Sequence, residues 1–420
     1  MHARIVERAP CKAQAVGILA TLLCVAISTG LTAAANAEAA ERFYYRVSAV
    51  DTSVDNLEFS ADGWLSWNQP GAGAYMIERS STLESWLPFA RGTAQAGRTQ
   101  AKVEEFAPPA GMVLIPGGEF RMGDILGDLN NATPVHQVTL SPYLMRKHEV
   151  TVAEAASGLQ WGLERSRLRV AEDGLSVTDS NGTVLMELGK HNSLIIFSGG
   201  AFTVRPGWEN HPAAYLSWFG CVTLCNIFGE MRGYPKCYNL DTWSCDFSVA
   251  GIRLPTEAEW ECAARGGRDG GRFPWPDADT INHERANYKA GPRPGATEPP
   301  PYDANPTPGL HPTYAEGDPP SSPVGAFAAN PYGLHDMAGN VWEWVWDWSL
   351  RYPSAPQIDP TGPETGIYRV FRGGSWFTTA GSCIVAARYR SSGPGDTVED
   401  VGFRYVIPCR EEPPAEGNGN

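Results

Sequence analysis

Residues 266–335 limit what this chain can fold into, because Gly, Pro, Asp, Asn and Tyr dominate them and almost no helical or strand periodicity is present. Compact domains seldom contain so long a segment without secondary structure of its own. Something must therefore hold the segment in place, and bound ions are one physical solution. The 45 glycines and 34 prolines among 420 residues point the same way, because helical bundles and coiled coils do not have this composition.

Aromatic content and charge narrow the class of protein further. The chain contains 14 tryptophans and 15 tyrosines, which indicates a folded protein because disordered chains are poor in aromatic residues. Its formal net charge is −14, whereas binding to a phosphate backbone needs clustered Lys and Arg. We therefore expect a globular, loop-rich protein that does not bind nucleic acid.

The start of the chain has the features of a targeting segment. Basic residues precede an apolar run over residues 15–35, which ends in the small-residue pattern Ala35-Asn36-Ala37. This pattern predicts a signal peptide, residues 1–37, that is cleaved after Ala37. The mature protein would then be exported, to the periplasm or the extracellular space, with no membrane attachment. The alternative is an uncleaved anchor, because the run approaches the about 20 residues that span a bilayer.

Seven cysteines remain after the predicted cleavage: Cys221, Cys225, Cys237, Cys245, Cys262, Cys383 and Cys409. In an oxidising compartment some of them should form disulfides, and the odd number leaves at least one over. Cys237 and Cys245 flank a short turn region and are the simplest local pair. A leftover thiol is a metal ligand, a nucleophile or, most simply, a small buried apolar side chain.

Turn residues divide the rest of the chain into units. Short alternating or aromatic runs, separated by Gly, Asn, Pro and Ser, predict strands at residues 44–47, 64–67, 75–78 and 99–103. Together they predict a small all-β, sandwich-like unit over residues 42–105, loosely similar to a fibronectin type III or immunoglobulin-like domain. A proline-containing linker follows at 106–110, then one large unit over 111–408 and a polar tail over 409–420.

Capping patterns predict two helices in the large unit. Ser217 precedes an apolar, helically periodic run over residues 218–228. Thr256 is followed three residues later by Glu259, which is the capping-box pattern in which the two side chains satisfy free backbone amides reciprocally. This second helix should extend to about Arg265.

Four blocks of the large unit, in this order, resemble the sulfatase-modifying-factor family, whose founding activity is the formylglycine-generating enzyme. They are Arg253-Leu254-Pro255-Thr256-Glu257-Ala258-Glu259-Trp260-Glu261, Tyr332-Gly333-Leu334-His335-Asp336-Met337-Ala338-Gly339-Asn340-Val341-Trp342-Glu343-Trp344, Arg372-Gly373-Gly374-Ser375-Trp376 and Gly402-Phe403-Arg404. The glycine-rich opening at 117–123 and Glu149-Val150-Thr151 fit as well. The resemblance implies an α+β fold related to C-type lectins, loop-rich and stabilised by calcium, with residues from about 153 to 210 as an insertion.

The resemblance also implies a chemistry. The enzyme oxidises a cysteine of an exported sulfatase to formylglycine with molecular oxygen and a copper(I) ion held by two thiolates, which are ligands that soft Cu(I) prefers. Counted from Trp376, Thr378 stands at the first thiol position and Cys383 at the second. Counted backward from Arg388, Cys383 shifts to a position without a ligand role. On either count the copper pair is incomplete, because a hydroxyl does not replace a thiolate.

Other positions of the implied pocket are present. Trp342 and Ser375 match residues that line the oxygen and substrate site of the enzyme. The alternative is that both are framework residues, with Ser375 forming a turn after two glycines and Trp342 filling the core.

The resemblance places a calcium ion at Asp336, Gly339, Val341 and Glu343. Two carboxylates and two carbonyls form a hard-oxygen set that suits Ca²⁺. Asn287 and Tyr288 match a second calcium site, with Glu316 and Asp318 as candidates for its remaining ligands. The alternative for Asp336 is an ordinary loop cap, and for Glu343 a solvated acid.

Two functions remain open. The chain is either a degenerate or divergent formylglycine-generating relative that acts on an exported, sulfatase-like protein or peptide, or a non-catalytic, calcium-stabilised lectin-like module that binds a peptide or a glycan. A metal hydrolase has no support, because the sequence contains no His-Glu-x-x-His or His-x-x-x-His pair.

Overall fold

The computed structural model describes residues 108–390 and 393–409 with their side chains and, before them, the backbone of seven strands between residues 25 and 102. The chain divides into two compact units, one of Met1–Ala107 with Cys409–Asn420 and one of Pro108–Pro408. Most of the predicted signal peptide lies outside the described residues, except for a strand at Val25–Ser28. Among the described residues, no helix is long and apolar enough to cross a membrane.

The first unit contains two antiparallel sheets. One has the order β1-β2-β5-β6, formed by β1 (Val25–Ser28), β2 (Arg42–Ala49), β5 (Gly73–Ser80) and β6 (Leu87–Ala94). The other has the order β3-β4-β7, formed by β3 (Asp55–Phe59), β4 (Trp64–Gln69) and β7 (Gly97–Lys102). The four runs predicted as strands coincide with β2, β4, β5 and β7.

The second unit is built on three small sheets around its core. The first has the order β20-β10-β9, with β9 (Gly118–Met122), β10 (His136–Leu140) and β20 (Gln357–Ile358). The second has the order β24-β11-β8, with β8 (Met112–Ile115), β11 (Tyr143–Arg146) and β24 (Val406–Pro408). The third has the order β22-β21-β19-β23, with β19 (Trp342–Trp348), β21 (Arg369–Arg372), β22 (Arg388–Tyr389) and β23 (Val401–Gly402).

The predicted insertion has secondary structure of its own. It consists of the helix α1 (Val152–Glu164) and the strands β12 (Arg169–Val170), β13 (Ser176–Thr178), β14 (Val184–Glu187), β15 (Ile195–Ser198) and β16 (Ala201–Val204). Thr151 and Glu154 form a complete capping box at the start of α1. The helix packs closely on its neighbour α2, because a Cβ on Gly158 would lie 2.8 Å from the Phe228 ring.

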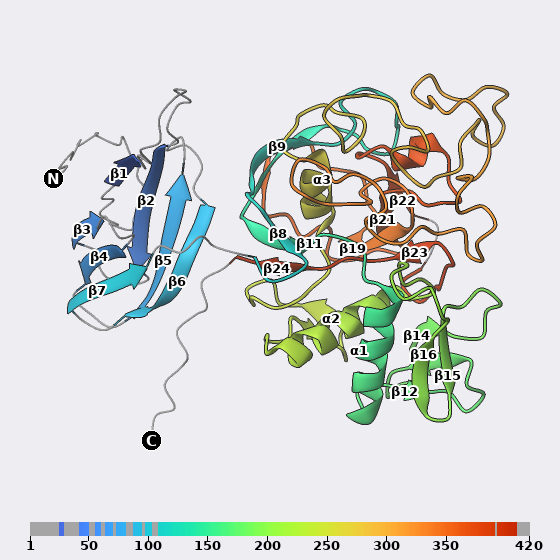
Figure 1. The fold of residues 1–420 in the computed structure, drawn as a ribbon, viewed down its shortest axis with the longest axis horizontal. Coiled ribbons are helices and arrows are strands. Elements are labelled where there is room, and N and C mark those ends of the chain that lie inside the picture. The colour runs from blue at the N-terminus through green and yellow to red at the C-terminus, as the bar shows by residue number, and fades with distance from the viewer. Residues whose placement is uncertain are drawn as a thin grey trace, which may run out of the picture. The chain divides into compact units, whose positions relative to one another are not determined.

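Both predicted helices are confirmed. Helix α2 (Trp218–Arg232) has Ser217 as its N-cap and Gly233, in the left-handed conformation, as its C-cap. Helix α3 (Glu257–Arg265) begins with the predicted Thr256–Glu259 capping box and ends at the predicted residue. In Figure 1, α1 and α2 lie below β19, β23 and β24, whereas α3 lies above these strands. The second unit therefore has an α+β, loop-rich fold, as predicted.

The predicted Cys237–Cys245 disulfide is not formed in the structure. The short hairpin of β17 (Tyr238–Asn239) and β18 (Ser244–Cys245) brings the two residues together, and both are free cysteines whose side chains hydrogen-bond to each other.

The irregular segment after α3 is also confirmed. Between Arg265 and Trp342, a span that the structure describes completely, there is no helix or strand. Polar side chains hold this segment in place. The Asp303 carboxylate accepts hydrogen bonds from the Tyr288 hydroxyl at 2.5 Å and the Gly291 amide at 2.7 Å. The Asn330 side chain donates to the Ala263 carbonyl at 2.8 Å, which ties the segment to α3.

Helix α3 carries acidic side chains into the interior of the second unit. All nine of its residues are buried, including Glu257 and Glu261. Glu261 accepts hydrogen bonds from the guanidinium groups of Arg265 and Arg372. Glu257 receives both a 2.8 Å and a 2.5 Å bond from Arg388. These ion pairs join α3 to β21 and β22, because Arg372 and Arg388 belong to those strands.

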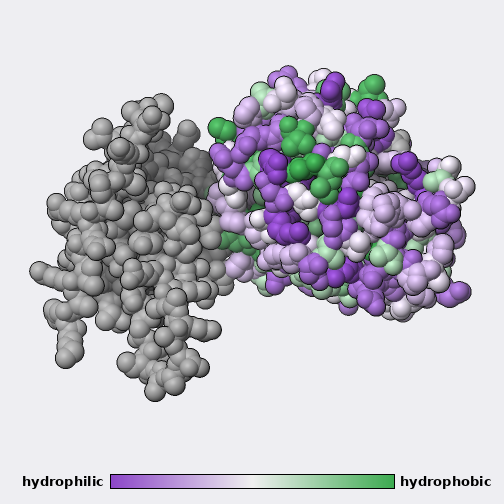
Figure 2. Space-filling model, turned by 90° about the horizontal axis from the view of Figure 1, so that it is seen from above, coloured by the Kyte–Doolittle hydropathy of each residue, from purple (hydrophilic) through white to green (hydrophobic). Residues whose placement is uncertain are grey.

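The alternating tryptophans of β19 serve packing. Trp344 is fully buried, and Arg369 stacks between Trp218 and Trp348, with its guanidinium carbon 3.8 Å and 3.6 Å from the two ring centroids. In Figure 2, most of the coloured residues are hydrophilic; a group of hydrophobic residues lies near the upper middle of this face, and others are scattered.

We predict that Arg372→Met destabilises the protein by about 3–5 kcal/mol, because it leaves the carboxylate of Glu261 buried with less compensation. Arg121→Met is the matched control: Arg121 pairs with Asp269, but both side chains are 49% exposed, and its loss should cost less than about 1 kcal/mol. Urea unfolding of the two variants provides the comparison. Equal losses would contradict the role assigned to the buried network.

Candidate functional site

The turn that follows β21 forms the centre of the candidate site. Gly373 and Gly374 have φ angles of 97° and 78°, a conformation that glycine adopts without steric cost. A Cβ on Gly374 would lie 2.8 Å from the sulfur of Cys383, so the turn packs directly on this cysteine. The Trp376 amide donates to the Asn340 carbonyl at 2.7 Å. The turn therefore lies against the loop that carries the predicted calcium ligands.

Ser375 and Trp342 are both held by contacts inside the protein. The Ser375 hydroxyl is fully buried and donates to the Asp400 carboxylate at 2.5 Å. Burial raises the pKa of Asp400 above its ordinary value. Trp342 is buried and stacks on Tyr389, with ring centroids 5.4 Å apart, while Tyr389 itself is 48% exposed. These contacts fit the framework alternative for Ser375 and place Trp342 beneath an exposed aromatic ring.

The residues at the two predicted thiol positions are both engaged in contacts inside the protein. The Thr378 hydroxyl accepts a hydrogen bond from the Ser375 amide at 2.8 Å and donates to the Ser375 carbonyl, so it closes the turn. Cys383 ends the short 3₁₀ helix Ala380–Cys383 and is fully buried. Burial, with a smaller contribution from Asp303, raises the pKa of its thiol well above the ordinary value. Burial therefore favours the neutral form of the thiol at the second position.

The predicted calcium loop shows a different distribution of charge than the resemblance implies. Both carboxylate oxygens of Glu343 accept bonds of 2.7 Å from Arg404, and one of them also accepts from the Trp260 indole at 2.8 Å. Asp336 has a φ of 58°, and one of its oxygens accepts from the Gly325 amide at 2.6 Å. Its other oxygen, Oδ1, is buried without a hydrogen-bond partner.

A further carboxylate reaches the same place from a distant part of the chain. Glu149 is fully buried, and one of its oxygens accepts from the Asn340 side chain at 3.1 Å. Its other oxygen, Oε2, has no hydrogen-bond partner. Burial raises the pKa of Glu149, and so does the nearby charge of Asp336. Two buried carboxylate oxygens therefore have no hydrogen-bond partner here, although no group of three or more His, Cys, Asp or Glu side chains among the described residues is arranged to hold a metal.

The residues of the second predicted calcium site are dispersed among other contacts. The Asn287 side chain donates to the Pro320 carbonyl at 2.9 Å, and its own carbonyl accepts from Asn340. The Tyr288 hydroxyl donates to Asp303. The Asp318 carboxylate faces His191, at 3.7 Å, and Glu316 is exposed.

The two residues that would supply carbonyl groups to the first predicted calcium site lie in the interior. Gly339 packs on Asn287, since a Cβ there would lie 2.4 Å from the Asn287 carbonyl oxygen. Val341 is buried immediately before β19.

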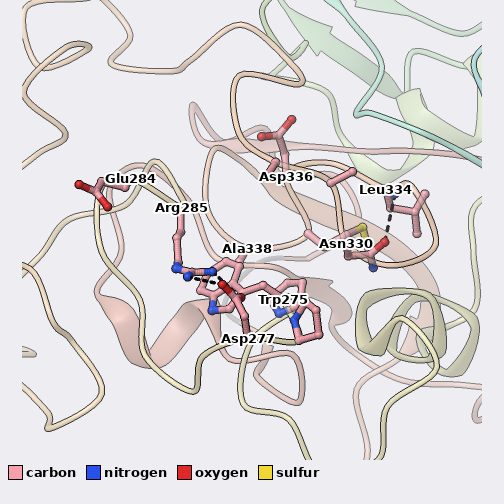
Figure 3. Close-up of a pocket in the computed structure, with 13 residues that line it drawn as sticks. Trp275, Asp277, Glu284, Arg285, Asn330, Leu334, Asp336 and Ala338 are labelled. Atoms are coloured by element: carbon pink, nitrogen blue, oxygen red, sulfur yellow. Dashed lines mark hydrogen bonds and ion pairs between the residues drawn. The ribbon is translucent and has the colours of Figure 1, made fainter.

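A cavity of about 180 Å³ lies beside the predicted calcium loop. Figure 3 shows its lining residues Trp275, Asp277 and Arg285, with Arg285 bound to both oxygens of Asp277 at 2.8 Å. The carboxylate of Asp336 points away from this ion pair in the same view. Asp336, Met337 and Ala338 of the predicted calcium loop all line the cavity.

Sequence analysis did not select Glu149, Asp400 or Arg404 as site residues. Glu149 and Arg404 belong to motifs that carry the family resemblance, but neither motif indicates by itself that both side chains point toward Asp336. Asp400 has no signal of its own, because it lies in a polar segment before β23.

Comparison with known proteins identifies relatives over most of the chain. Residues 98–409 match the model of the sulfatase-modifying factor enzyme 1-like domain. The formylglycine-generating enzyme of Thermomonospora curvata is 35% identical over 333 residues, which cover 72% of this chain and 94% of that protein. The serine/threonine-protein kinase pkn1 of Chlamydia pneumoniae is 32% identical over 70% of this chain, but the match covers only 37% of the kinase. Among solved structures, PvdO from Pseudomonas aeruginosa is 22% identical, with a TM-score of 0.48 and coverage of 71% of this chain and 94% of that one.

We predict that iodoacetamide modifies Cys383 at least about a hundredfold more slowly in the native protein than after denaturation, because the thiol is both buried and held neutral. Phe377→Cys is the matched control, since Phe377 belongs to the same turn and is 55% exposed. Peptide mapping by mass spectrometry should find this new cysteine labelled in the native state. Rapid native labelling of Cys383 would show that its sulfur is accessible after all.

Proposed function

Because the chain belongs to the family of sulfatase-modifying factor enzyme 1-like domains, we propose that it is a member that does not generate formylglycine and acts instead as an exported binding module for a peptide or a glycan. It has the fold of this family. The observation that carries the proposal is the state of the two thiol positions. The Thr378 hydroxyl hydrogen-bonds to the backbone of Ser375 within its own turn, and Gly374 packs directly on the buried sulfur of Cys383.

The side chains around the turn support binding rather than oxidation. Phe377 is 55% exposed, and the Lys289 ammonium lies 5.4 Å from the centre of its ring. Tyr389 is half exposed above the buried Trp342. Exposed aromatic rings with a polar or charged neighbour suit the apolar face of a sugar or the side chains of a peptide. The exported location rests on the predicted signal peptide, which would bring the module to partners outside the cytoplasm.

The alternative function is a divergent formylglycine-generating enzyme. It is favoured by the 35% identity with the Thermomonospora curvata enzyme, which extends over 94% of that protein. The partner would then be an exported, sulfatase-like protein whose cysteine enters the site.

We predict that the protein does not convert a peptide containing Cys-x-Pro-x-Arg to its formylglycine form in the presence of copper(I) and oxygen. Mass spectrometry of the peptide after incubation measures this directly. Thr378→Cys should raise the affinity for copper(I) without producing turnover, because Cys383 remains buried. The double variant Thr378→Cys/Cys383→Ser should lose this gain if the two sulfurs act together. Copper-dependent formylglycine formation by the wild-type protein would refute the proposal in favour of the enzyme.

The binding role makes a separate prediction. Phe377→Ser should weaken binding of a peptide or glycan found by array screening by about fivefold, since stacking on an exposed ring contributes about 1 kcal/mol. Ile358→Ser provides a control, because Ile358 is 79% exposed and lies in β20, outside the turn. Isothermal titration calorimetry gives the affinities. Equal effects of the two substitutions, or no ligand for the wild-type protein, would argue against this surface.

A further inference from the structure

The cavity beside the predicted calcium loop combines an apolar floor with an open rim. Its floor is formed by the buried side chains of Leu334, Met337 and Ala338, and the exposed residues Ala328 and Ala329 stand at its rim. Its volume is about 180 Å³. A cavity of about 150 Å³ already holds a benzene ring. The cavity therefore has room for one six-membered ring, and solvent reaches it at the rim.

Arg285 brings unused hydrogen-bond donors to this cavity. Its Nη1 and Nη2 atoms donate to Oδ1 and Oδ2 of Asp277, each at 2.8 Å, and the carbon of its guanidinium lies 5.3 Å from the ring centre of Trp275. A guanidinium has five N–H groups. Among the described residues, the Arg285 side chain donates to no group other than Asp277. Three of its donors are therefore free for a ligand, in an orientation that Asp277 and Trp275 hold in place.

Asp277 supplies acceptors beside these donors. Each of its oxygens accepts one bond from Arg285, whereas a carboxylate oxygen has two acceptor positions. The hydrogen bond from Arg285 lowers the pKa of Asp277, so the carboxyl group is ionised at neutral pH. The two bonds between the side chains keep free donors and free acceptors next to each other at a fixed spacing.

The remaining polar groups of the lining disfavour a charged ligand. The Asn330 side chain is occupied by backbone groups of the protein. Glu284 and Asp336 add two carboxyl groups to the lining without a further cation, and Figure 3 shows both directed away from Arg285 and Asp277. An anion would therefore meet an excess of negative charge. A cation would have no acceptor for the free donors of Arg285, whereas a neutral hydroxyl group both donates and accepts.

We propose that this cavity binds the ring of a neutral sugar through two neighbouring hydroxyl groups, without a metal ion. The hydroxyls accept hydrogen bonds from the free N–H groups of Arg285 and donate to the free acceptor positions of Asp277. The apolar floor takes the C–H groups of the ring. The inference rests on the proposed binding function and deepens it, because it selects a sugar over a peptide and gives it a place other than the turn at Phe377.

The test is titration of the whole protein, in the presence of a chelator, with the methyl glycosides of glucose, galactose and mannose and of the matching uronic acids. Ligand-observed NMR measures the affinities. At least one neutral glycoside should bind, and at least about tenfold more tightly than its uronic acid, because the acid brings a negative charge to the carboxylates of the lining. A glycan array then shows whether the sugar is free or the end of a longer chain: an array signal identifies a chain end, and binding of the glycosides alone identifies a free sugar.

Substitutions locate the binding at the cavity. Arg285→Gln should weaken it by at least about tenfold, because hydrogen bonds from a charged group are lost. Arg285→Lys should weaken it as well, because Lys keeps the charge without the forked donors. Both variants should melt like the wild type, since an ion pair as exposed as Arg285–Asp277 contributes little to stability. Arg121→Gln is the matched control, because Arg121 forms an exposed ion pair with Asp269 outside the cavity, and its affinity should not change.

Several outcomes would overturn the inference. They are the absence of binding by all neutral glycosides, equal or tighter binding of the uronic acids, binding of peptides alone, and an unchanged affinity in Arg285→Gln. Loss of binding in Phe377→Ser but not in Arg285→Gln would place the sugar at the turn, so the inference would fail while the proposed binding function stands. Formylglycine formation by the wild type would refute the proposed function, whereas these titrations test the cavity separately.

Discussion

The buried ion pairs of α3 are the interaction on which the second unit depends. Glu257 and Glu261 belong to a helix with no exposed face. Arg372 and Arg388, from two neighbouring strands of one sheet, form ion pairs with them. An apolar contact would tolerate sliding, whereas charged groups that have lost their water must keep their partners in place. The same Arg372 also donates to the carbonyls of Val385, Ala386 and Ala387. The Arg372 side chain thus links three parts of the unit: helix α3, strand β21 and the chain segment after Cys383.

The candidate site inherits its geometry from this arrangement. Arg372 is the last residue of β21, and the glycine turn begins immediately after it. The turn therefore leaves the core at a position that the ion pairs determine, and it contacts the predicted calcium loop through Trp376 and Asn340. Thr378, at the first predicted thiol position, closes this turn, because its hydroxyl accepts a hydrogen bond from the Ser375 amide.

Local patterns allowed much of the fold to be predicted. The Thr256–Glu259 box gave the start of α3, since capping depends only on residues close in sequence, and the composition of 266–335 indicated an irregular segment. The equivalent box at Thr151–Glu154 was present in the sequence and was overlooked as the start of α1. Contacts between distant residues were not predictable. Neither Glu149 nor Arg404 has a neighbour in sequence that reveals which carboxylate it faces, so the division of charge between Glu343 and Asp336 could be seen only in three dimensions. The side chains whose hydrogen bonds hold the irregular segment in place, such as Asp303, could not be predicted for the same reason.

The pairing of β8 and β24 with the same strand has a consequence for the occurrence of this domain within longer chains. β11 lies between them in a three-stranded sheet, so the first and last strands of the second unit are separated by a single strand. Because both strands are antiparallel to β11, the chain enters this sheet beside Arg146 and leaves it beside Tyr143, so the two ends are separated by no more than this short sheet. Domains whose ends lie close together tolerate insertion into another chain. This property agrees with its appearance as about a third of a much longer kinase chain in Chlamydia pneumoniae.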